Sequence, residues 1–462
     1  MPTLPGQIFS PPSAGSLRFV LFATAVTAIG AFLFGYDTAV INGANSYLKA
    51  HLSLNPAQEG MAGASAILGC IPGAMAAGVL SDRFGRRKML FLCALLYAVS
   101  GVLSAIPRTF PQFLAARFIS GLGIGASSLI CPVYIAEISP GKWRGRLGSL
   151  FQLGIVTGIF LTLFINKLIQ SLGDETWNIS SGWRWMLGME TVPALLFIAL
   201  LFTVPESPRW LIQNGREAEG RDILARIAGS DQAGIELEAI RAANRAEQGR
   251  FSELFTRQYR RPLLVAAVLM AGSQFCGINA IIYYSSKIFE SAGALKNAAF
   301  TSTVWIGLVN LLFTFVAIGF VDKAGRRPLL LIGTGVQVIA LALVGWMFQS
   351  HQQGPGLLLC IVAFIAAFAM ALGPLSWLVC SEIFPNKIRG RAMSIATFII
   401  WSSCYVVAQT FPMLNDSQAV GPALTFWLYG AVSLLTFGFI LALVPETKGR
   451  TLEEIELYWK NR

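Results

Sequence analysis

The feature that most constrains this chain is a series of long segments without charged side chains. Residues 89–107, 147–166 and 328–350 contain no Asp, Glu, Lys or Arg. A helix needs ~18 to 20 apolar residues to cross the hydrocarbon core of a bilayer, and these segments are long enough. Charged residues make up 13% of the chain, against roughly 25% in soluble proteins. The sequence therefore predicts an all-α membrane protein held in the lipid bilayer.

Twelve such segments follow one another along the chain. We place them at 17–43, 58–80, 88–107, 111–136, 146–170, 183–204, 261–286, 297–321, 327–350, 356–381, 391–413 and 421–444. They predict twelve transmembrane helices. Residues 1–16 lack the basic region of a cleaved secretory signal, and we expect them to form a cytoplasmic N-terminal segment.

The basic residues indicate how the chain is oriented. Most of the 35 Lys and Arg lie in every second gap between spans; the other gaps hold only Lys49, Arg108, Lys167, Arg184, Lys287 and Lys296. Loops rich in Lys and Arg stay in the cytoplasm. We therefore expect a multi-pass protein of the plasma membrane (the inner membrane of the cell) with both termini cytoplasmic. The formal charge of +11 then faces anionic lipid, which excludes a nucleic-acid partner.

One long polar stretch, 205–260, separates spans six and seven. In residues 216–228, Ile223, Leu224 and Ile227 share one helical face. Residues 231–247 show a weaker pattern of the same kind. We expect short cytoplasmic linker helices here, and a flexible linker is the alternative.

Three charged phrases occur twice, about half a chain apart. GVLSDRFGRRK (78–88) resembles IGFVDKAGRRP (318–328), YIAEISPGKWRGRL (134–147) resembles LVCSEIFPNKIRGRA (378–392), and VPESPR (204–209) resembles VPETKG (444–449). Their common order predicts two parallel six-helix bundles, at 17–204 and 261–444, with a linker at 205–260 and a tail at 445–462. Parallel halves with a substrate site between them are a transporter architecture.

All of these phrases fall on the predicted cytoplasmic side and mix both signs of charge. We interpret them as a cytoplasmic gate whose ion pairs hold the bundle ends together while the cavity opens outward. The alternative is that they are ordinary loop charges that only set the topology. The predicted gate residues are Asp82, Arg83, Arg86, Glu137, Arg144, Glu206, Asp322, Arg326, Glu382, Arg389 and Glu446.

Ionisable residues inside the spans need an explanation of their own. Asp37 lies in span one and Arg117 in span four. Each costs ~2.5–3.5 kcal/mol at the centre of a membrane helix on insertion scales, so we expect them to pair. Burial disfavours a charged carboxyl and a nearby cation favours it; such an acid is suited to proton coupling. A static ion pair is the alternative. Glu190, a third acid, has no predicted role beyond pairing within the bundle.

Amide and aromatic side chains gather in the second half of the chain. Buried amides offer both donors and acceptors, and indole faces stack on C–H surfaces, so the set suits a neutral, hydroxyl-rich ligand. Helix–helix contacts for the amides and an interfacial belt for the tryptophans are the alternatives. The polar and aromatic residues found in this way are Gln152, Gln274, Asn279, Asn310, Tyr283, Tyr284, Trp377 and Trp401.

The sequence gives little support for disulfides, metal binding or enzymatic catalysis. All seven Cys lie in apolar stretches, so neither a disulfide framework nor a zinc site is expected. We find no nucleophile–base set and no phosphate-binding loop, and we expect neither an enzyme nor a bound cofactor or metal.

Several phrases resemble those of the sugar porter family of the major facilitator superfamily. They are GxxxDRxGRR (78–87), PESPRWL (205–211), QFCGINAIIYYS (274–285), DKAGRRP (322–328) and PETKGRTLEEIE (445–456), and the resemblance covers about residues 17 to 457. It implies twelve helices in two bundles, four cytoplasmic linker helices and alternating access.

The resemblance also assigns roles to residues. Gln152, Gln274, Asn279, Asn310 and Trp377 match positions that contact monosaccharide in the family, with Phe34 and Trp401 nearby. Asp37 and Arg117 match the acid–base couple of proton-linked members, whereas passive members have a neutral residue in place of Asp37.

The chain also departs from the family. Ser273, Ile400 and Cys404 stand where amides are common in it, so the sugar cannot be transferred from a relative.

We therefore expect a monomeric transporter that imports a monosaccharide (a hexose, a pentose or a related polyol) together with a proton. A passive facilitator in which Asp37 is structural is one alternative. A sugar-sensing receptor without net transport is another, although only a short tail follows the last span. A drug exporter is disfavoured because amides suit hydroxyl groups better than lipophilic cations.

Overall fold

The structure is a computed structural model that describes residues 16–141, 143–245, 251–352, 354–449, 454–455 and 458–459, without the side chains of 243–245, 251, 322 and 386. The predicted segment 1–16 therefore lies outside the described residues except for Ser16. The side chain of Asp322, one of the predicted gate residues, also lies outside them.

Within the described residues, twelve helical segments are long and apolar enough to cross a membrane, which confirms the predicted fold class. The first six are α1 (Leu17–Leu52), α2 (Pro56–Phe84), α3 (Arg86–Ala105), α4 (Phe110–Ile138), α5 (Arg144–Gln170), and a sixth made of α6 (Glu175–Trp177), η1 (Asn178–Gly182), α7 (Trp183–Gly188) and α8 (Thr191–Leu201). The last six are α12 (Arg257–Phe275) with α13 (Ile278–Ser291), α14 (Lys296–Ala324), α15 (Arg326–Gln349), α16 (Pro355–Met370) with α17 (Leu372–Glu382), α18 (Asn386–Asn415) and α19 (Gly421–Leu443).

The linker is helical, as the sequence predicts. It contains α9 (Pro208–Gln213), α10 (Glu217–Ala228), α11 (Ser230–Arg245) and η2 (Phe251–Phe255). The apolar faces of α10 and α11 meet around the buried side chains of Leu224 and Leu237. This contact explains why a polar stretch folds here rather than remaining a flexible connection.

Three predicted spans are not continuous helices. The seventh is broken at Gly277, whose φ of +89° suits glycine because it has no Cβ. The tenth is broken at Ala371 (φ −124°, ψ −94°), three residues before Pro374, which has no N–H to donate to a helix. The sixth begins earlier than predicted, at Glu175, and is interrupted just before Thr191. Such breaks place polar backbone groups inside the bundle.

The first span is longer than predicted, because α1 continues from residue 43 to Leu52. Its added turns contain polar residues, and hydropathy therefore ends the span early. Asn45 and Tyr47 are nevertheless buried. The helix continues because this part of α1 packs against other helices rather than facing lipid or water.

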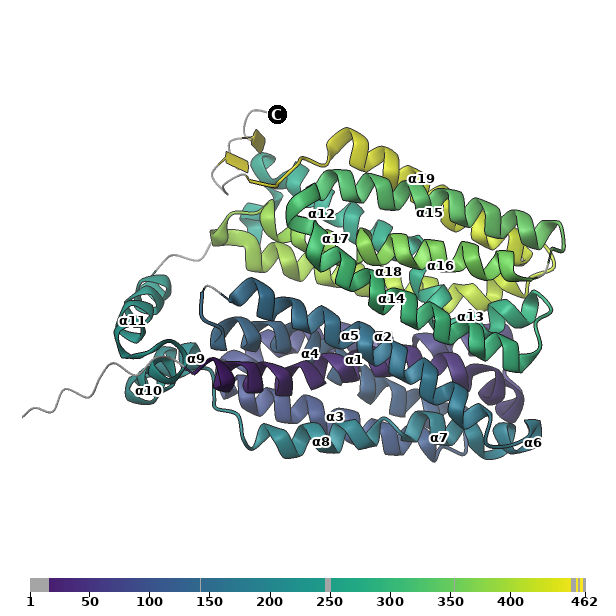
Figure 1. Ribbon diagram of the computed structural model, residues 1–462, viewed down its shortest axis with the longest axis horizontal. Helices are drawn as coiled ribbons and strands as arrows, with labels where there is room; N and C mark the ends of the chain where they lie inside the picture. Colours follow the sequence, from purple (N-terminus) through teal and green to yellow (C-terminus); the bar gives the residue numbers. More distant parts are fainter. Residues whose placement is uncertain are drawn as a thin grey trace, which may run out of the picture.

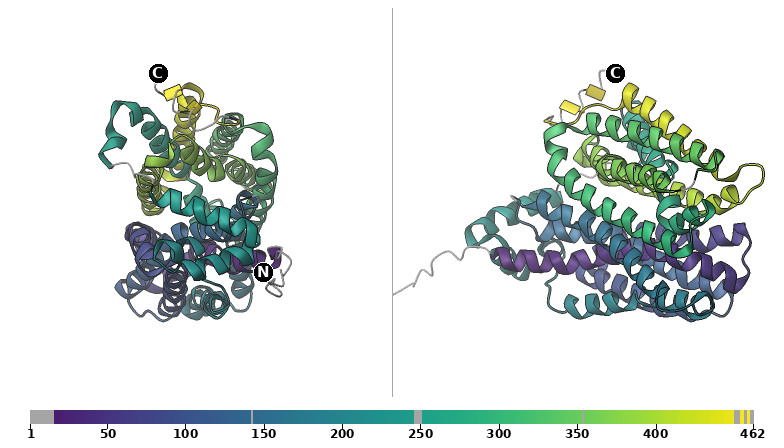
Figure 2. Two further views of the ribbon diagram at one scale, coloured as in Figure 1. Left: turned by 90° about the vertical axis from the view of Figure 1, so that its left-hand side faces the viewer. Right: turned by 45° about the vertical axis from the view of Figure 1, so that its right-hand side comes forward.

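The helices gather into two halves that lie side by side along their length (Figures 1 and 2). The N-terminal half contains α1 to α8 and the C-terminal half α12 to α19. Helices α9 to α11 lie beyond one end of the bundle (Figure 1). We call this the basic end, because α3 and α15 begin there with Arg86 and Arg326, and the opposite one the far end. The exact domain bounds given by the sequence stay a prediction.

Small residues bring the helices of the N-terminal half unusually close. A Cβ added at Gly121 of α4 would lie 1.8 Å from the Ala66 carbonyl oxygen of α2, and one at Gly35 of α1 would lie 1.9 Å from the Ile155 carbonyl oxygen of α5. Small residues allow this backbone-to-backbone packing in membranes, where apolar burial alone does not drive helix association. It fixes α1 and α4, the two helices that carry Asp37 and Arg117.

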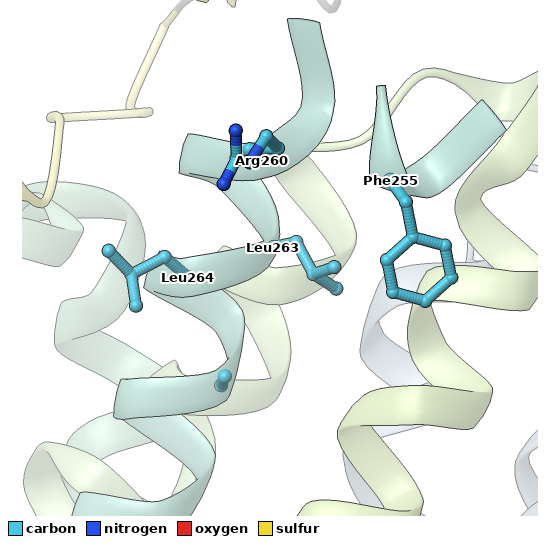
Figure 3. Close-up of a pocket in the computed structure, with 5 residues that line it drawn as sticks. Phe255, Arg260, Leu263 and Leu264 are labelled. Atoms are coloured by element: carbon cyan, nitrogen blue, oxygen red, sulfur yellow. The ribbon is translucent and has the colours of Figure 1, made fainter. Parts of the chain in front are cut away.

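A pocket of about 460 Å³ lies beside the beginning of α12. Phe255, Arg260, Leu263, Leu264 and Ala267 line it (Figure 3). It contains none of the residues that the sequence predicts for the functional site.

Candidate functional site

Asp37 and Arg117 form a direct ion pair between α1 and α4, as the sequence predicts. Arg117 Nη1 donates to Asp37 Oδ1, and Arg117 Nη2 donates to the Asp37 backbone oxygen at 3.2 Å. The exposed fractions are 0% for Asp37 and 2% for Arg117. A pair so far from water is barely screened by salt. The sequence showed both charges, and the structure shows that they face each other.

Glu190 lies close to this pair and makes it a group of three. It is 1% exposed and interacts electrostatically with both Asp37 and Arg117. Asp37 Oδ2, Arg117 Nε and Glu190 Oε1 have no hydrogen-bond partner among the described residues. Two carboxyl groups thus lie within electrostatic range of one guanidinium, which pairs directly with Asp37 alone. Their unpartnered atoms leave room for a change of protonation. Sequence reasoning had recognised Glu190 as an intramembrane acid without placing it.

Three predicted ligand-binding residues meet across the break in the seventh span. Asn279, in the first turn of α13, donates to Gln274 Oε1 at the end of α12. The same Asn279 nitrogen lies 3.1 Å from the Cys404 sulfur of α18, and the Tyr283 hydroxyl also bonds to Cys404. Gly277 makes this arrangement possible, because the turn at its positive φ folds Asn279 back toward Gln274.

Tyr283 connects the amide cluster with the ion pair. It lies in the C-terminal half and interacts electrostatically with Arg117 of the N-terminal half. Cys70 of α2 also interacts electrostatically with Cys404, Asp37 and Arg117. The buried acid–base group and the amide cluster are therefore neighbours across the boundary between the halves.

The remaining predicted ligand residues are less closely connected. The rings of Phe34 (α1) and Trp401 (α18) meet across the halves, with centroids 5.8 Å apart. Gln152 of α5 is half-buried, Asn310 of α14 is buried, and Trp377 of α17 is exposed. The structure records no side-chain hydrogen bond from these last three to another described residue.

Tyr284 is placed differently from Tyr283. Its hydroxyl donates to the Ala408 carbonyl oxygen at 2.9 Å, and its ring stacks on Phe411 with centroids 5.2 Å apart. The side chain is fully buried. Its hydrogen-bonding capacity thus serves the packing of α13 on α18.

The charged phrases of the N-terminal half form one network at the basic end. Arg86 bridges Asp82 and Glu137, at 3.0 Å from each. Glu206 accepts the backbone N–H groups of Arg86 and Arg87 at 2.9–3.2 Å, so its carboxylate, in the segment between α8 and α9, caps the N-terminus of α3. Burial nevertheless raises the pKa of Glu206 and outweighs these donors.

The C-terminal half repeats this network with its own residues. Arg326 pairs with Glu382 at 3.1 Å, and Glu446 accepts the backbone N–H groups of Arg326 and Arg327 at 3.0 and 3.1 Å. Burial opposes ionisation of Glu446, but the backbone N–H groups of Lys448, Arg326 and Arg327 outweigh it and lower its pKa.

Three of the predicted gate residues take other partners. Arg83 lies over the Phe84 ring, Arg144 donates to the Ala136 carbonyl oxygen, and Arg389 donates to the Phe384 carbonyl oxygen. Among the described residues, each ion pair of the two networks lies within one half. In this conformation these ion pairs therefore brace each half separately.

The halves are joined instead at the far end. Among the described residues, every hydrogen bond or ion pair between the two halves lies there. Asn42 of α1 is the buried centre of this contact: its amide donates to the Ile282 carbonyl oxygen at 2.7 Å and to Ser285 Oγ at 2.6 Å, and its backbone oxygen accepts from Ser286 Oγ at 2.9 Å. Sequence reasoning missed Asn42, because a single Asn in a span gives no sign of its partner.

An ionic cluster lies beside Asn42. Lys287 of α13 contacts Glu59 of α2 and Asp416, which follows α18, each at 2.8 Å, and Lys49 of α1 contacts the same two acids. Burial opposes ionisation of Asp416, but hydrogen bonds from Lys287, Asn415 and Lys49 outweigh it and lower its pKa. Lys49 and Lys287 are two of the six basic residues in the gaps that are otherwise poor in Lys and Arg. The sequence therefore marks them as exceptions but does not indicate their partners.

Comparison with known proteins identifies relatives along the whole chain. The sugar (and other) transporter family model matches residues 23–459. An arabinose-proton symporter of Bacillus subtilis is 41% identical over 446 residues, or 96% of each chain. A D-xylose-proton symporter of Escherichia coli is 38% identical and also covers 96% of each chain. Proteins with these names are membrane transporters rather than enzymes.

Solved structures show the same fold. The inward-open conformation of the xylose transporter XylE from E. coli matches with a TM-score of 0.86 at 37% identity, covering 96% of this chain and 100% of that one. XylE bound to 6-bromo-6-deoxy-D-glucose matches with a TM-score of 0.81 at 37% identity, covering 96% and 99%. The fold and the relatives together mark a multi-pass protein of the plasma membrane. The chain therefore belongs to the sugar porter family of the major facilitator superfamily.

Proposed function

We propose that this chain imports a monosaccharide together with a proton by alternating access. The observation that carries the proposal is the buried Asp37–Arg117 pair, which lies next to the amide cluster through Tyr283. An intramembrane acid–base pair beside a set of neutral hydrogen-bonding groups supplies a proton site and a sugar site within reach of each other. Its relatives include proton-linked symporters of arabinose and xylose.

The proton step follows from the charges of the group of three. When Asp37, Glu190 and Arg117 are all ionised, the group has one negative charge too many for a buried site, and uptake of one proton neutralises it. Protonation of Asp37 also removes its attraction to Arg117. Because α1 carries both Asp37 and Asn42, a shift of this helix reaches the contact between the two halves.

The sugar site uses the amide cluster and the aromatic rings. Gln274 and Asn279 offer donors and acceptors to hydroxyl groups, and Trp401 offers a ring face to C–H surface. Gln152, Asn310 and Trp377 complete the proposed site as the halves approach each other. Pentoses are the first sugars to test, since the two relatives compared above are named for pentoses. The departures at Ser273, Ile400 and Cys404 require hexoses and polyols to be tested beside them.

The conformation fits an inward-facing state. Hydrogen bonds and ion pairs close the far end, and the match to the inward-open XylE structure has a higher TM-score than the match to the sugar-bound one. We assign the basic end to the cytoplasm, with both termini there, because that end collects the Lys and Arg of the loops. The protein acts as a monomer in the bilayer, with one transport path between its halves.

The test is external pH in a weakly buffered suspension of de-energised cells that express the protein. Arabinose, xylose, glucose and polyols are added one at a time, and tracer uptake is followed in parallel. One proton moving through 100 mV supplies ~2.3 kcal/mol, which is about a 50-fold sugar gradient. We expect alkalinisation with at least one sugar. Asp37→Asn should abolish alkalinisation and uphill accumulation, yet retain exchange of labelled for unlabelled sugar.

The matched control is Asp222→Asn, the same change on an exposed position of α10, which should behave like the wild type. A sugar that enters without moving the pH would make the protein a passive facilitator. Equal accumulation by the wild type and Asp37→Asn would contradict the role of Asp37.

A further inference from the structure

Four charged side chains form a closed ring at the far end: Lys49, Glu59, Lys287 and Asp416. Lys49 Nζ lies 2.8 Å from Glu59 and 3.1 Å from Asp416. Lys287 Nζ lies 2.8 Å from each of the same two acids. Each base thus contacts both acids, and each acid contacts both bases.

The ring is divided evenly between the halves. Lys49 and Glu59 belong to α1 and α2 of the N-terminal half, while Lys287 and Asp416 belong to the C-terminal half. One ion pair therefore lies within each half, and the other two cross between the halves. Each half contributes one positive and one negative charge.

This division decides what happens when the halves separate. Lys49 keeps Glu59, and Lys287 keeps Asp416, so each half retains a neutral pair. Breaking an ion pair costs the most free energy when it leaves a buried charge without a partner. Opening of the ring leaves no charge in that condition. Separation removes the two crossing pairs and nothing else.

The ring is shielded from water on one side. The Glu59 side chain is 1% exposed and that of Lys287 12%, and Asn45 donates a further hydrogen bond of 2.7 Å to Glu59. Buried pairs are screened by salt much less than surface pairs. The crossing pairs therefore contribute to closure in a way that scattered surface charges do not.

We propose that this ring is a partner-sharing latch that closes the far end and sets the population of the state open at the basic end. The inference rests on the proposed function, because alternating access requires the far end to open. It adds a specific mechanism: closure is stabilised by two crossing pairs, and opening leaves no charge unpaired.

Neutralising one acid gives the first expectation. Glu59→Gln removes one pair within the N-terminal half and one crossing pair from the closed state, but only the former from the open state. The net loss is one crossing pair, so the ratio of open to closed far ends should rise up to about fivefold. Asp416→Asn changes a side chain that is 24% exposed. It should produce the same change in the ratio, and it replaces Glu59→Gln if that variant folds poorly.

Charge reversal distinguishes closure by the crossing ion pairs from a role of the same side chains in local packing. Lys49→Glu with Glu59→Lys preserves a neutral pair inside the N-terminal half but makes both crossing contacts repulsive, so the open state should predominate. Asn45 Oδ1, which has no partner among the described residues, is available to a lysine at position 59. Adding Lys287→Glu with Asp416→Lys reverses the other half and makes all four pairs attractive again, and closure should return.

The populations are measured without any sugar, by double electron–electron resonance on purified protein. Spin labels are attached at Leu172→Cys in the N-terminal half and Leu295→Cys in the C-terminal half, where the native side chains are 76% and 82% exposed. The native cysteines are buried or half-buried, and the chain without the two introduced cysteines gives the background. Short distances report a closed far end and long distances an open one.

Restoration of the short-distance population only when both halves are reversed would support the latch. An unchanged distribution in the variants with one neutralised acid and in the half-reversed variant would overturn it, as would a fourfold variant that stays open. The proposed function fails separately: it falls if the wild type moves no sugar with a proton, whatever the distances show.

Discussion

At the scale of single residues, Glu206 and Glu446 occupy equivalent positions in the two halves, yet their pKa values are shifted in opposite directions. Both carboxylates cap the first turn of a helix that begins just after a glycine, at Gly85 and Gly325. Each glycine has a φ above +90°, and a Cβ at Gly85 would lie 2.3 Å from Glu206 Oε2. The motif thus needs glycine for both its backbone and its space. Glu206 is the more deeply buried of the two acids, and the directions of their pKa shifts differ accordingly.

These opposite shifts predict opposite pH dependences. The pKa of Glu206 is raised above its ordinary value of 4.5, so its contribution to stability is present at low pH and declines as pH rises through the folded-state pKa. The pKa of Glu446 is lowered from 4.5, so its contribution is present above that value and declines as pH falls through the lower folded-state pKa.

The measurement is the melting temperature of purified protein between pH 3.5 and pH 7, for the wild type, Glu206→Gln and Glu446→Gln. Differences of ~1–3 °C are expected. Glu206→Gln should remove part of any loss of stability toward neutral pH, and Glu446→Gln part of any loss toward acid pH. The same pH profile for both variants would show that the two caps are equivalent after all.

At the scale of elements, α2 connects the halves through glycine. A Cβ added at Gly63 would lie 2.1 Å from the Tyr284 hydroxyl oxygen, and one at Gly60 would lie 2.1 Å from the Gln409 carbonyl oxygen. Tyr284 is held by its hydrogen bond to Ala408 and its stacking on Phe411, so it cannot easily move aside. The far end therefore closes only because α2 has no side chains at these positions.

We predict that Gly63→Ala disfavours closure of the far end. The added methyl group meets a fixed hydroxyl, and overpacking of this kind costs about 1–3 kcal/mol. Distances between labels at positions 172 and 295 should then shift toward longer values by a population change of about fivefold or more. Gly78→Ala on the same helix is the control, because its Cβ would meet only Leu129 Cδ2 at 3.7 Å. Equal distance distributions for the two variants would contradict the steric argument.

The broken seventh span is the other element that matters for function. Gln274 lies at the end of α12, before the break, and α13 carries Asn279 just after it, followed by Ser285, Ser286 and Lys287. One short helix, α13, thus bears an amide of the proposed sugar site, the hydroxyl partners of Asn42 and a base of the ring. We therefore expect a ligand that moves Asn279 to affect the closure of the far end.

At the scale of the whole molecule, the two halves are similar in pattern and different in content. Both have the charged network at the basic end, and the N-terminal half also has the intramembrane group of Asp37, Arg117 and Glu190. The amide cluster lies in the C-terminal half. The proposed proton site and the amide cluster of the proposed sugar site thus lie in opposite halves. This arrangement suits a coupled transporter, because each ligand acts on the boundary from its own side.

We predict that the basic end and both termini face the cytoplasm. Loops rich in Lys and Arg are retained there during insertion. Fluorescent protein fused after residue 462 should be fluorescent, and alkaline phosphatase at the same point inactive. The opposite pattern is expected for insertions after Leu172 at the far end, which act as the internal control. A fluorescent fusion at both points would contradict the assigned orientation.

The sequence by itself determined the number of spans, their order, the repeat and the helical linker. Each depends on local properties: the apolar length that a bilayer requires, the helical spacing of apolar residues and the recurrence of short phrases. It also pointed to Asp37 and Arg117, because charges inside apolar segments are conspicuous. The roles of the remaining candidate residues, the gate included, stay predictions.

Only the tertiary structure decided which groups meet. Glu59 and Lys287 are separated by 228 positions, and their contact depends on how the halves lean toward each other, which no local pattern encodes. The same holds for Glu190 beside Arg117 and for Asn42 beneath α13. Polar side chains in a membrane are satisfied by whichever partners the helix packing brings near, so the sequence shows that they need partners and the fold chooses them.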